Sequence, residues 1–422
     1  MRIFTLALFS LFFLCRCARA PEESKAYVTQ KESNAGMIRS PEPGKEIPPV
    51  AGKREPAKAP KHKFNPVPRP VAEGPAPLPD STRMRLMNTL RMKNIQPDLN
   101  EPVSREALLN PTSSEPYSSL IELSRESFLK INFDNDILNN TDMYYTNGIR
   151  FDLIFPFVQS FPVSRLMIPY WGRAVNYYGF SLFQNMYTPS TTKVGGIHYG
   201  DRPYAAYLCV GLFKITLDPV HRFRQTSELD LGIIGQASFG EFVQKAYHDN
   251  TPTNNEPLGW EYQIRNDLVL NYNLLMEKGL IHEKHLELNA EAAAQLGTLY
   301  TNIEGGFHLR AGLMNPYFAN LGVSKRDRTR ELGLRNSQVF FFVKSSCRLV
   351  GYDATLEGGL FNHTSPYTMP ASEISRFMWE SSAGLSFVIY GVRLDAEQYF
   401  LSPEFHGGKW HFWVHAGLTF CL

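Results

Sequence analysis

Alternation of apolar and polar residues governs this chain from about residue 118 to its end. In 285–296, for example, Leu and Ala recur at every second position, and Glu, Asn and Gln occupy most positions between them. The stretches 260–274, 303–313 and 409–420 alternate in the same way. A period of two held for about ten residues is typical of long β-strands with one apolar and one polar face.

Twelve strand-like runs of this kind follow one another along the chain. Alternation alone fits a lipocalin-like soluble barrel or a β-sandwich equally well. The runs are long, however, their polar faces carry full charges, and single-chain bacterial membrane barrels have an even strand number. We therefore expect an all-β fold, a twelve-stranded antiparallel transmembrane β-barrel over 118–422. The runs are 124–134, 146–155, 177–187, 203–217, 227–236, 260–276, 285–296, 301–313, 338–357, 379–390, 391–402 and 409–421.

Aromatic residues make up 13% of the chain, and several lie at the ends of the expected strands. Transmembrane barrels carry belts of aromatic side chains at both membrane interfaces. The residues expected to form such girdles are Tyr144, Tyr145, Tyr170, Trp171, Tyr177, Tyr178, Trp379 and Tyr399.

The first 20 residues have the pattern of a signal peptide. Arg2 supplies a positive charge, 3–14 are apolar, and 18–20 offer small residues for cleavage. The segment 21–115 comes next, and 17 of the 29 prolines lie between Pro21 and Pro116. Such a composition buries too little apolar surface to fold, so we expect a disordered periplasmic linker. The sequence does not identify a partner for it.

Charge balance, the lengths of apolar runs and the number of cysteines exclude several classes of protein. Lys and Arg number 43 against 41 Asp and Glu, which argues against nucleic-acid binding. Beyond the N-terminus no run of 18 apolar residues occurs, which excludes transmembrane helices. The cysteines beyond the signal peptide, Cys209, Cys347 and Cys421, match neither a disulfide framework nor a metal-binding spacing.

Polar motifs concentrate in three connections between expected strands. The first contains Asn135-Asp136, the second Asp201-Arg202, and the third His248. Connections 1–2, 3–4 and 5–6 of an up-and-down barrel all lie at the same end. With a periplasmic N-terminus that end is extracellular, so the motifs should converge at one extracellular rim, as a functional site requires.

Each motif also has an ordinary structural explanation. Asn135-Asp136 could be a strand-ending turn, and Asp201-Arg202 could be a surface ion pair of little energetic effect. A single histidine such as His248 is more often a hydrogen-bonded structural residue than a base. Their expected co-location favours a site, although it does not identify a reaction.

Together these segments resemble the outer-membrane lipid A 3′-O-deacylase family. The resemblance covers about 120–422 and depends on several motifs in one order. It departs at Ala206, where the family usually has Gly, and at the C-terminal Leu422, where a terminal aromatic is usual. The matching motifs are Asn135-Asp136, Thr141-Asp142-x-Tyr144-Tyr145-Thr146-Asn147-Gly148, Tyr187-Thr188-Pro189, Asp201-Arg202-Pro203-Tyr204-Ala205, Ala237-Ser238, Gln244, His248, Gly259-Trp260-x-x-Gln263, Gly306 to Arg310 and Pro403-Glu404-Phe405.

The resemblance implies an enzyme that removes the 3′-linked acyloxyacyl group from lipid A in the outer leaflet of the outer membrane, with Ca2+, and so remodels lipopolysaccharide. It assigns catalytic roles to Asn135, Asp136, Thr146 and His248. Asp136 and Asn135 would also be the metal ligands. The implied substrate-binding residues are Asp201, Arg202 and Tyr145.

The implied chemistry is physically coherent. A neutral His can accept a proton from water near physiological pH, and Ca2+ takes oxygen ligands and stabilises a developing oxyanion. No Gly-x-Ser-x-Gly elbow occurs, so Ser238 is a nucleophile only in a less favoured interpretation. Two other functions stay open, a non-catalytic porin or anchor and a phospholipase-type barrel esterase.

Overall fold

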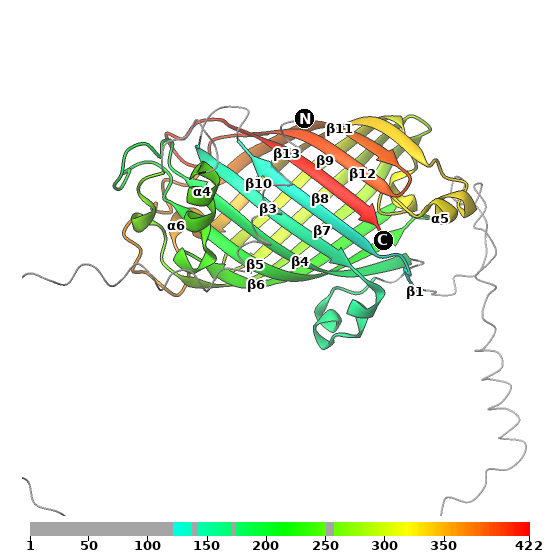
Figure 1. Cartoon of the computed structure of the whole chain (residues 1–422), viewed down its shortest axis with the longest axis horizontal. Helices are drawn as coiled ribbons and strands as arrows, with labels where there is room; N and C mark the ends of the chain where they lie inside the picture. The colour runs from blue at the N-terminus through cyan, green and yellow to red at the C-terminus, as the bar shows by residue number, and fades with distance from the viewer. Residues whose placement is uncertain (1–120, 137–141, 171, 173, 250–256) are drawn as a thin grey trace, which may run out of the picture. The chain divides into compact units, whose positions relative to one another are not determined.

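A computed structural model describes residues 121–136, 142–170, 172, 174–249 and 257–422 (Figure 1). The signal peptide and the Pro-rich linker expected in 1–115 lie outside these residues. Within the described part, one sheet of long strands closes on itself, and the chain runs up and down around it.

The barrel consists of the twelve strands β2 to β13, each antiparallel to both neighbours. β13 pairs with β2, and β4 pairs with β5, so the sheet has no free edge. The short β1 (Ile121–Leu123) adds to β4 in parallel, outside this cycle. The expected strand number is confirmed. The strands are β2 (Phe128–Asn135), β3 (Tyr144–Ile154), β4 (Ala174–Thr188), β5 (Ala205–Asp218), β6 (Phe223–Ile234), β7 (Asp267–Glu283), β8 (Leu286–Gly297), β9 (Tyr300–Leu313), β10 (Ser337–Asp353), β11 (Phe377–Ile389), β12 (Val392–Leu401) and β13 (His411–Cys421).

Polar residues of the strands point into the barrel, and apolar residues point outward. Glu287 and Asn289 of β8 are almost fully buried, whereas Leu296 and Ile303 are 70% and 58% exposed. A soluble barrel would show the opposite arrangement, with its polar face in water. The two-faced strands therefore settle the choice between soluble and membrane barrel.

Short helices occupy the connections between strands. No helix in the described segments combines the length and the apolar character that crossing a bilayer requires. The sequence did not predict α4, and 260–262 form a 3-10 turn rather than strand, because Gly259 turns the chain with a φ of 109°. The helices are η2 (Pro156–Ser160), η3 (Pro162–Leu166), η4 (Gln236–Ser238), α4 (Gly240–Asp249), η5 (Trp260–Tyr262), η6 (Tyr317–Ala319), α5 (Arg326–Glu331) and α6 (Ala354–Glu357).

Most of the expected girdle residues do not face the membrane. Tyr144 and Tyr177 are buried, and Tyr178 packs beneath the β3–β4 connection. Tyr399 stacks on Trp413 with ring centroids 4.9 Å apart, and Tyr145 contacts Trp413 as well. Tyr170 is half-buried, bound to Asp218, and Trp171 lies outside the described residues. The prediction was wrong because most of these rings pack against buried residues inside the barrel, and because the β3–β4 connection covers Tyr178. Trp379, 40% exposed, fits the girdle.

The two ends of the barrel differ in their connections. We call the end with the β2–β3, β4–β5, β6–β7, β8–β9, β10–β11 and β12–β13 connections the rim, and the opposite end the base. Figure 1 shows α4 and α6 at the rim and α5 at the base. The three motif-bearing connections share the rim, as parity predicted.

Candidate active site

Asn135, Asp136 and Thr146, which we call the rim cluster, meet where β2 leaves the barrel wall and β3 enters it. The Asn135 side-chain amide donates to the Thr146 carbonyl at 3.2 Å, and the Thr146 hydroxyl donates to Asp136 at 3.4 Å. The Met143 amide donates to the other Asp136 oxygen at 3.0 Å. The three predicted residues are therefore brought together.

A β-bulge and a left-handed residue at the start of β3 orient the side chains of the rim cluster. The β3–β4 register shifts between Tyr145 and Asn147, so Thr146 is the extra residue of a bulge. Bulges re-aim side chains and are frequent beside active sites. Tyr144, just before it, has a φ of 59°, a left-handed conformation that costs a non-glycine residue about 1–3 kcal/mol. The packing of its ring against Phe405 and His411 holds this strained residue in place.

The rim cluster is buried. Asp136 is 1% exposed and Thr146 is 2% exposed. A carboxylate out of water is costly unless donors or a cation compensate it. The Met143 amide and the Thr146 hydroxyl donate to the Asp136 carboxylate. The rim cluster is therefore a buried, hydrogen-bonded polar site.

Tyr145 belongs to the wall below the rim cluster. Its hydroxyl donates to Asp134 at 2.9 Å, and its ring lies 5.3 Å from that of Tyr187. The ring of Tyr187 in turn lies 4.2 Å beneath the guanidinium of Arg202. This stack of rings connects the first motif to the second.

Arg202 is fully buried and joins three connections. Its guanidinium forms a 2.6 Å ion pair with Glu404 of the β12–β13 connection. It also donates at 2.6 Å to the Thr355 hydroxyl of α6. Burial alone disfavours the charged guanidinium, but the carboxylates of Glu404 and Asp353 outweigh this cost and raise the pKa of Arg202. Arg202 is thus a permanent internal charge rather than an exposed one.

Asp201 fixes the loop beside Arg202. Its carboxylate accepts from the backbone amides of Ser190 and Arg202 at 2.9 and 2.8 Å. Its carbonyl accepts from the Tyr367 hydroxyl at 3.0 Å. Sequence analysis did not find Tyr367 or Thr355, because both lie in the β10–β11 connection, more than 150 residues away in the chain.

His248 lies near the C-terminal end of α4, and its side chain lies outside the described residues. The preceding Tyr247 shows where this end of the helix is. Burial, followed by the charges of Asp142 and Asp136, raises the pKa of Tyr247. The last turn of α4 is therefore close to the carboxylates of the β2–β3 connection.

Close packing seats α4 on the barrel wall. A Cβ atom added at Gly240 would lie 2.3 Å from the Ala206 Cβ, so only glycine fits at this point. Further along, Gln244 accepts a 2.6 Å hydrogen bond from the Trp260 indole. Gly259-Trp260 and Gln244, which the motif comparison singled out, thus position the helix that carries His248.

Ser238 has a structural environment. It is fully buried, and its hydroxyl donates to the Gly235 carbonyl at 2.6 Å. A nucleophile needs a base within hydrogen-bond distance of its hydroxyl. The described surroundings of Ser238 supply a backbone carbonyl instead, which favours the water-attack interpretation.

The rim cluster fits a hard cation. Asp136 offers a carboxylate, Asn135 an amide oxygen, and Thr146 a hydroxyl and a carbonyl, all oxygen ligands of the kind Ca2+ takes. The cluster contains no thiol or imidazole, the ligands preferred by softer metals. Asp136 is 1% exposed, so an ion bound there would be largely shielded from water.

Comparisons with known proteins agree with this architecture. A family model described as "Outer membrane protein LpxR" matches residues 107–420. Among solved structures, LpxR from Salmonella typhimurium has a TM-score of 0.55 at 19% identity, covering 70% of this chain and 100% of that one. The β domain of the Bordetella autotransporter BrkA reaches a TM-score of 0.37 at 10% identity, covering 71% and 100%. None of the curated proteins matches the chain.

These matches differ in what they establish. At 19% identity the Salmonella structure shows a shared fold, whereas the autotransporter domain, with a TM-score below 0.5, establishes nothing about this chain. The family model spans β2 to β12 and nearly all of β13, including every motif-bearing connection of the rim. It confirms the family recognised from the motifs. This chain belongs to the family of the outer membrane protein LpxR and is an outer-membrane β-barrel.

Proposed function

We propose that this protein is a Ca2+-dependent lipid A deacylase that hydrolyses the 3′-linked acyloxyacyl ester in the outer leaflet. The observation that carries the proposal is the buried rim cluster of Asn135, Asp136 and Thr146, held by a bulge in a member of the LpxR family. A passive pore or anchor has no need of a buried carboxylate and a strained backbone beside it.

In this mechanism His248 is the general base that takes a proton from the attacking water. A histidine suits this role near neutral pH, and base catalysis contributes about 10²–10⁴-fold. Asp136 and Asn135 would hold Ca2+, which when bound would supply Lewis-acid stabilisation of negative charge on the ester oxygen. Thr146 orients Asp136 through its hydroxyl.

The second motif shapes the substrate site in our proposal. Arg202 is fully buried and bound to Glu404, so we assign it the positioning of three rim connections. Asp201 and Tyr145 complete this framework, Asp201 by ordering the loop and Tyr145 through its stack with Tyr187. In this proposal Arg202, Asp201 and Tyr145 position the rim connections, and the residues of the rim cluster contact the substrate directly.

An apolar surface beside α4 suits acyl chains. Phe239 and Phe242 are 60% and 55% exposed, and Leu258 lies exposed in the same β6–β7 connection. Exposed apolar clusters rimmed by polar residues mark lipid or protein contacts. We propose that these residues receive the hydrocarbon of the bound lipid while the rim cluster receives the ester.

A substrate in the outer leaflet requires the rim to lie on the extracellular side of the outer membrane. A membrane-impermeant maleimide should label His363→Cys in the β10–β11 connection on intact cells. It should not label His285→Cys in the tight β7–β8 turn of the base. Both positions are exposed, so access alone distinguishes them. The reverse pattern would place the site in the periplasm and remove the outer leaflet as its substrate source.

Mass spectrometry of lipid A tests the function itself. Cells expressing the wild-type protein should accumulate lipid A that lacks the 3′-acyloxyacyl group, and cells expressing His248→Ala should not. Loss of fatty acid from glycerophospholipid instead would identify a phospholipase-type esterase. An unchanged profile for both lipids, with the barrel folded in the membrane, would leave the passive barrel as the explanation.

A further inference from the structure

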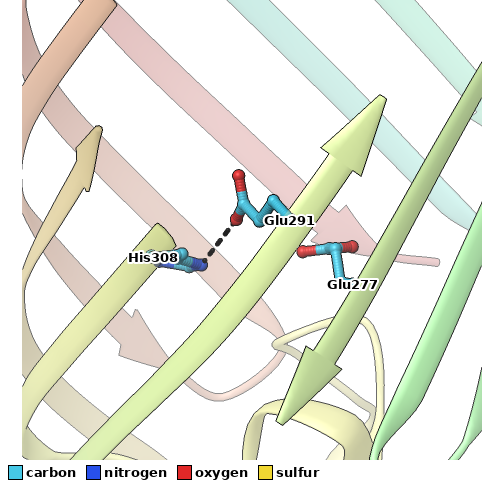
Figure 2. Close-up of side chains that lie close together, drawn as sticks. All are labelled: Glu277, Glu291 and His308. Carbon is cyan, nitrogen blue, oxygen red and sulfur yellow. Dashed lines mark ion pairs between the residues drawn. The ribbon is translucent and has the colours of Figure 1, made fainter. Parts of the chain in front are cut away.

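A second polar cluster lies in the lumen toward the base, built from consecutive strands. Glu277 of β7, Glu291 of β8 and His308 of β9 point toward one another (Figure 2). One ligand atom from each lies within 4.8 Å of the other two. We call these residues the basal triad. Glu277 and Glu291 lie outside the motifs of the resemblance, whereas His308 lies within its Gly306 to Arg310 segment.

The sheet register forces two of these charges together. Glu277 and Glu291 are direct cross-strand partners in the antiparallel β7–β8 pair. Like charges placed directly opposite each other destabilise a sheet. Glu277 has compensation, because Arg224 lies 3.2 Å from one of its oxygens and the Tyr317 hydroxyl donates to the other. Among the described residues, Glu291 forms an ion pair with the His308 imidazole, at 3.5 Å.

The hydrogen bonding of His308 is a second, independent indication that this cluster binds a ligand. The residue is 6% exposed, and its Nδ1 atom has no hydrogen-bond partner although it is directed at Glu291. Its ring is held by the rings of Tyr317, at 5.3 Å, and Phe342, at 6.1 Å. A buried polar atom without a partner is costly. Here that atom points at a carboxylate that itself opposes another carboxylate.

The positive groups around the triad do not remove this imbalance. Lys344 lies in the same part of the lumen, but its ammonium pairs with Glu397 at 3.1 Å. Arg310 pairs with Glu287 at 2.7 Å. Arg224 pairs with Glu277, so in the described part of the chain no Lys or Arg forms an ion pair with Glu291, which lies next to the Nδ1 atom that makes no hydrogen bond.

We propose that the basal triad binds a divalent transition-metal ion of the Zn2+ type. One imidazole nitrogen and two carboxylates form a donor set that suits Zn2+. Ca2+ prefers oxygen ligands alone, so this site differs in chemistry from the rim cluster. Zn2+ with ligands at about 2.1 Å needs its donors about 3.4 Å apart. The three atoms lie within 4.8 Å of one another, so binding requires them to approach by about 1.4 Å or less, and the ion would then link β7, β8 and β9.

Zinc titration of the intact protein tests this site separately from the rim. Full-length protein in detergent is stripped with chelator, saturated with Ca2+ to fill the rim, and titrated with ZnCl2 in a calorimeter. One Zn2+ should bind per chain. His308→Gln and Glu291→Gln should each weaken binding by about 100-fold or more, since even groups that only orient a ligand contribute 10–100-fold.

Two matched variants control for the loss of charge and of imidazole. Glu304→Gln removes a carboxylate from β9 that pairs with Arg348 at 2.8 Å, and His282→Gln removes a lumenal imidazole paired with Glu287 at 2.7 Å. Both should bind Zn2+ like wild type. The unheated gel mobility typical of a folded barrel should be kept by all four variants.

X-ray absorption at the zinc edge gives the direct signature, one nitrogen at about 2.0–2.1 Å with oxygen ligands beside it. Wild-type protein that fails to bind Zn2+ would overturn the proposal and leave a proton shared between Glu277 and Glu291 as the explanation. Binding lost in Asp136→Ala but kept in His308→Gln would place the metal at the rim and equally overturn it. Neither result depends on whether the protein hydrolyses lipid A.

Discussion

The rim and the base of this barrel both hold buried polar clusters, and the chain builds them in different ways. At the rim, Asn135, Asp136 and Thr146 lie within twelve residues of one another, and a bulge and a loop bring them together. Toward the base, Glu277, Glu291 and His308 are single inward positions of three regular strands.

This difference decides what each cluster can do. The rim cluster lies where β2 and β3 meet their connection, at the end of the barrel that also carries α4 and α6. The basal triad lies between strands that hydrogen-bond along their length, and Tyr317 of the base covers it. The rim suits chemistry, whereas the triad suits a fixed ion.

Removal of Ca2+ should produce the largest effect, confined to the rim. Chelation with EGTA should abolish lipid A hydrolysis in detergent micelles, because it would remove the Ca2+ proposed to bind at Asp136 and Asn135, and added Ca2+ should restore it. Asp136→Ala should also be nearly inactive, with partial recovery at excess Ca2+. Hydrolysis that continues unchanged in EGTA would remove Ca2+ from the mechanism.

Loss of the proposed base comes next in size. His248→Ala should reduce hydrolysis by about 10²–10⁴-fold while the barrel stays folded, as gel mobility can show. His363→Ala, an exposed histidine of another rim connection, is the matched control and should be fully active. If His248→Ala keeps its activity while Ser238→Ala loses it, an acyl-enzyme route replaces the attack by water.

Disruption of the Arg202 ion pair should affect stability more than chemistry. Arg202→Ala leaves Glu404 buried without its partner, which typically costs about 3–5 kcal/mol. Urea unfolding in micelles, followed by tryptophan fluorescence, should show this loss. The double variant Arg202→Met/Glu404→Gln should recover part of it, because no uncompensated charge remains. A wild-type unfolding midpoint for Arg202→Ala would show that this pair does not hold the rim together.

The smallest expected effect concerns alkaline pH at α4. Burial and the nearby Asp142 and Asp136 raise the pKa of Tyr247 above its ordinary value of about 10. The stabilisation from neutral Tyr247 is therefore complete below about pH 10 and is lost as pH rises through the higher folded-state pKa. Tyr247→Phe should flatten the fall of the unfolding midpoint between pH 9 and 11. Tyr199→Phe, a mostly exposed rim residue, should leave that fall as in wild type, and equal curves for wild type and Tyr247→Phe would contradict the prediction.

The barrel fold and the convergence of the three motifs at the rim could be predicted from the sequence because both depend on local sequence patterns. Period-two alternation gave the strands, and parity gave the shared end of the three motifs. Sequence analysis missed α4, a helix of ten residues whose position depends on contacts of Gly240 with Ala206 and of Gln244 with Trp260. It also misjudged the girdle, because a tyrosine at a strand end faces in or out according to register, which composition does not contain.

The amino-acid sequence by itself determined the fold class, the strand number, the family and the three motifs of the rim. These properties follow from patterns among residues that are close in sequence. Alternation and contiguous motifs can be identified without knowing which strands are neighbours in the sheet. Only the tertiary structure decided that Arg202 is sealed against Glu404, some 200 residues away, and that Glu277 opposes Glu291 beside His308. Closure of the sheet fixes one register for every strand pair, and that register alone decides which distant charges meet.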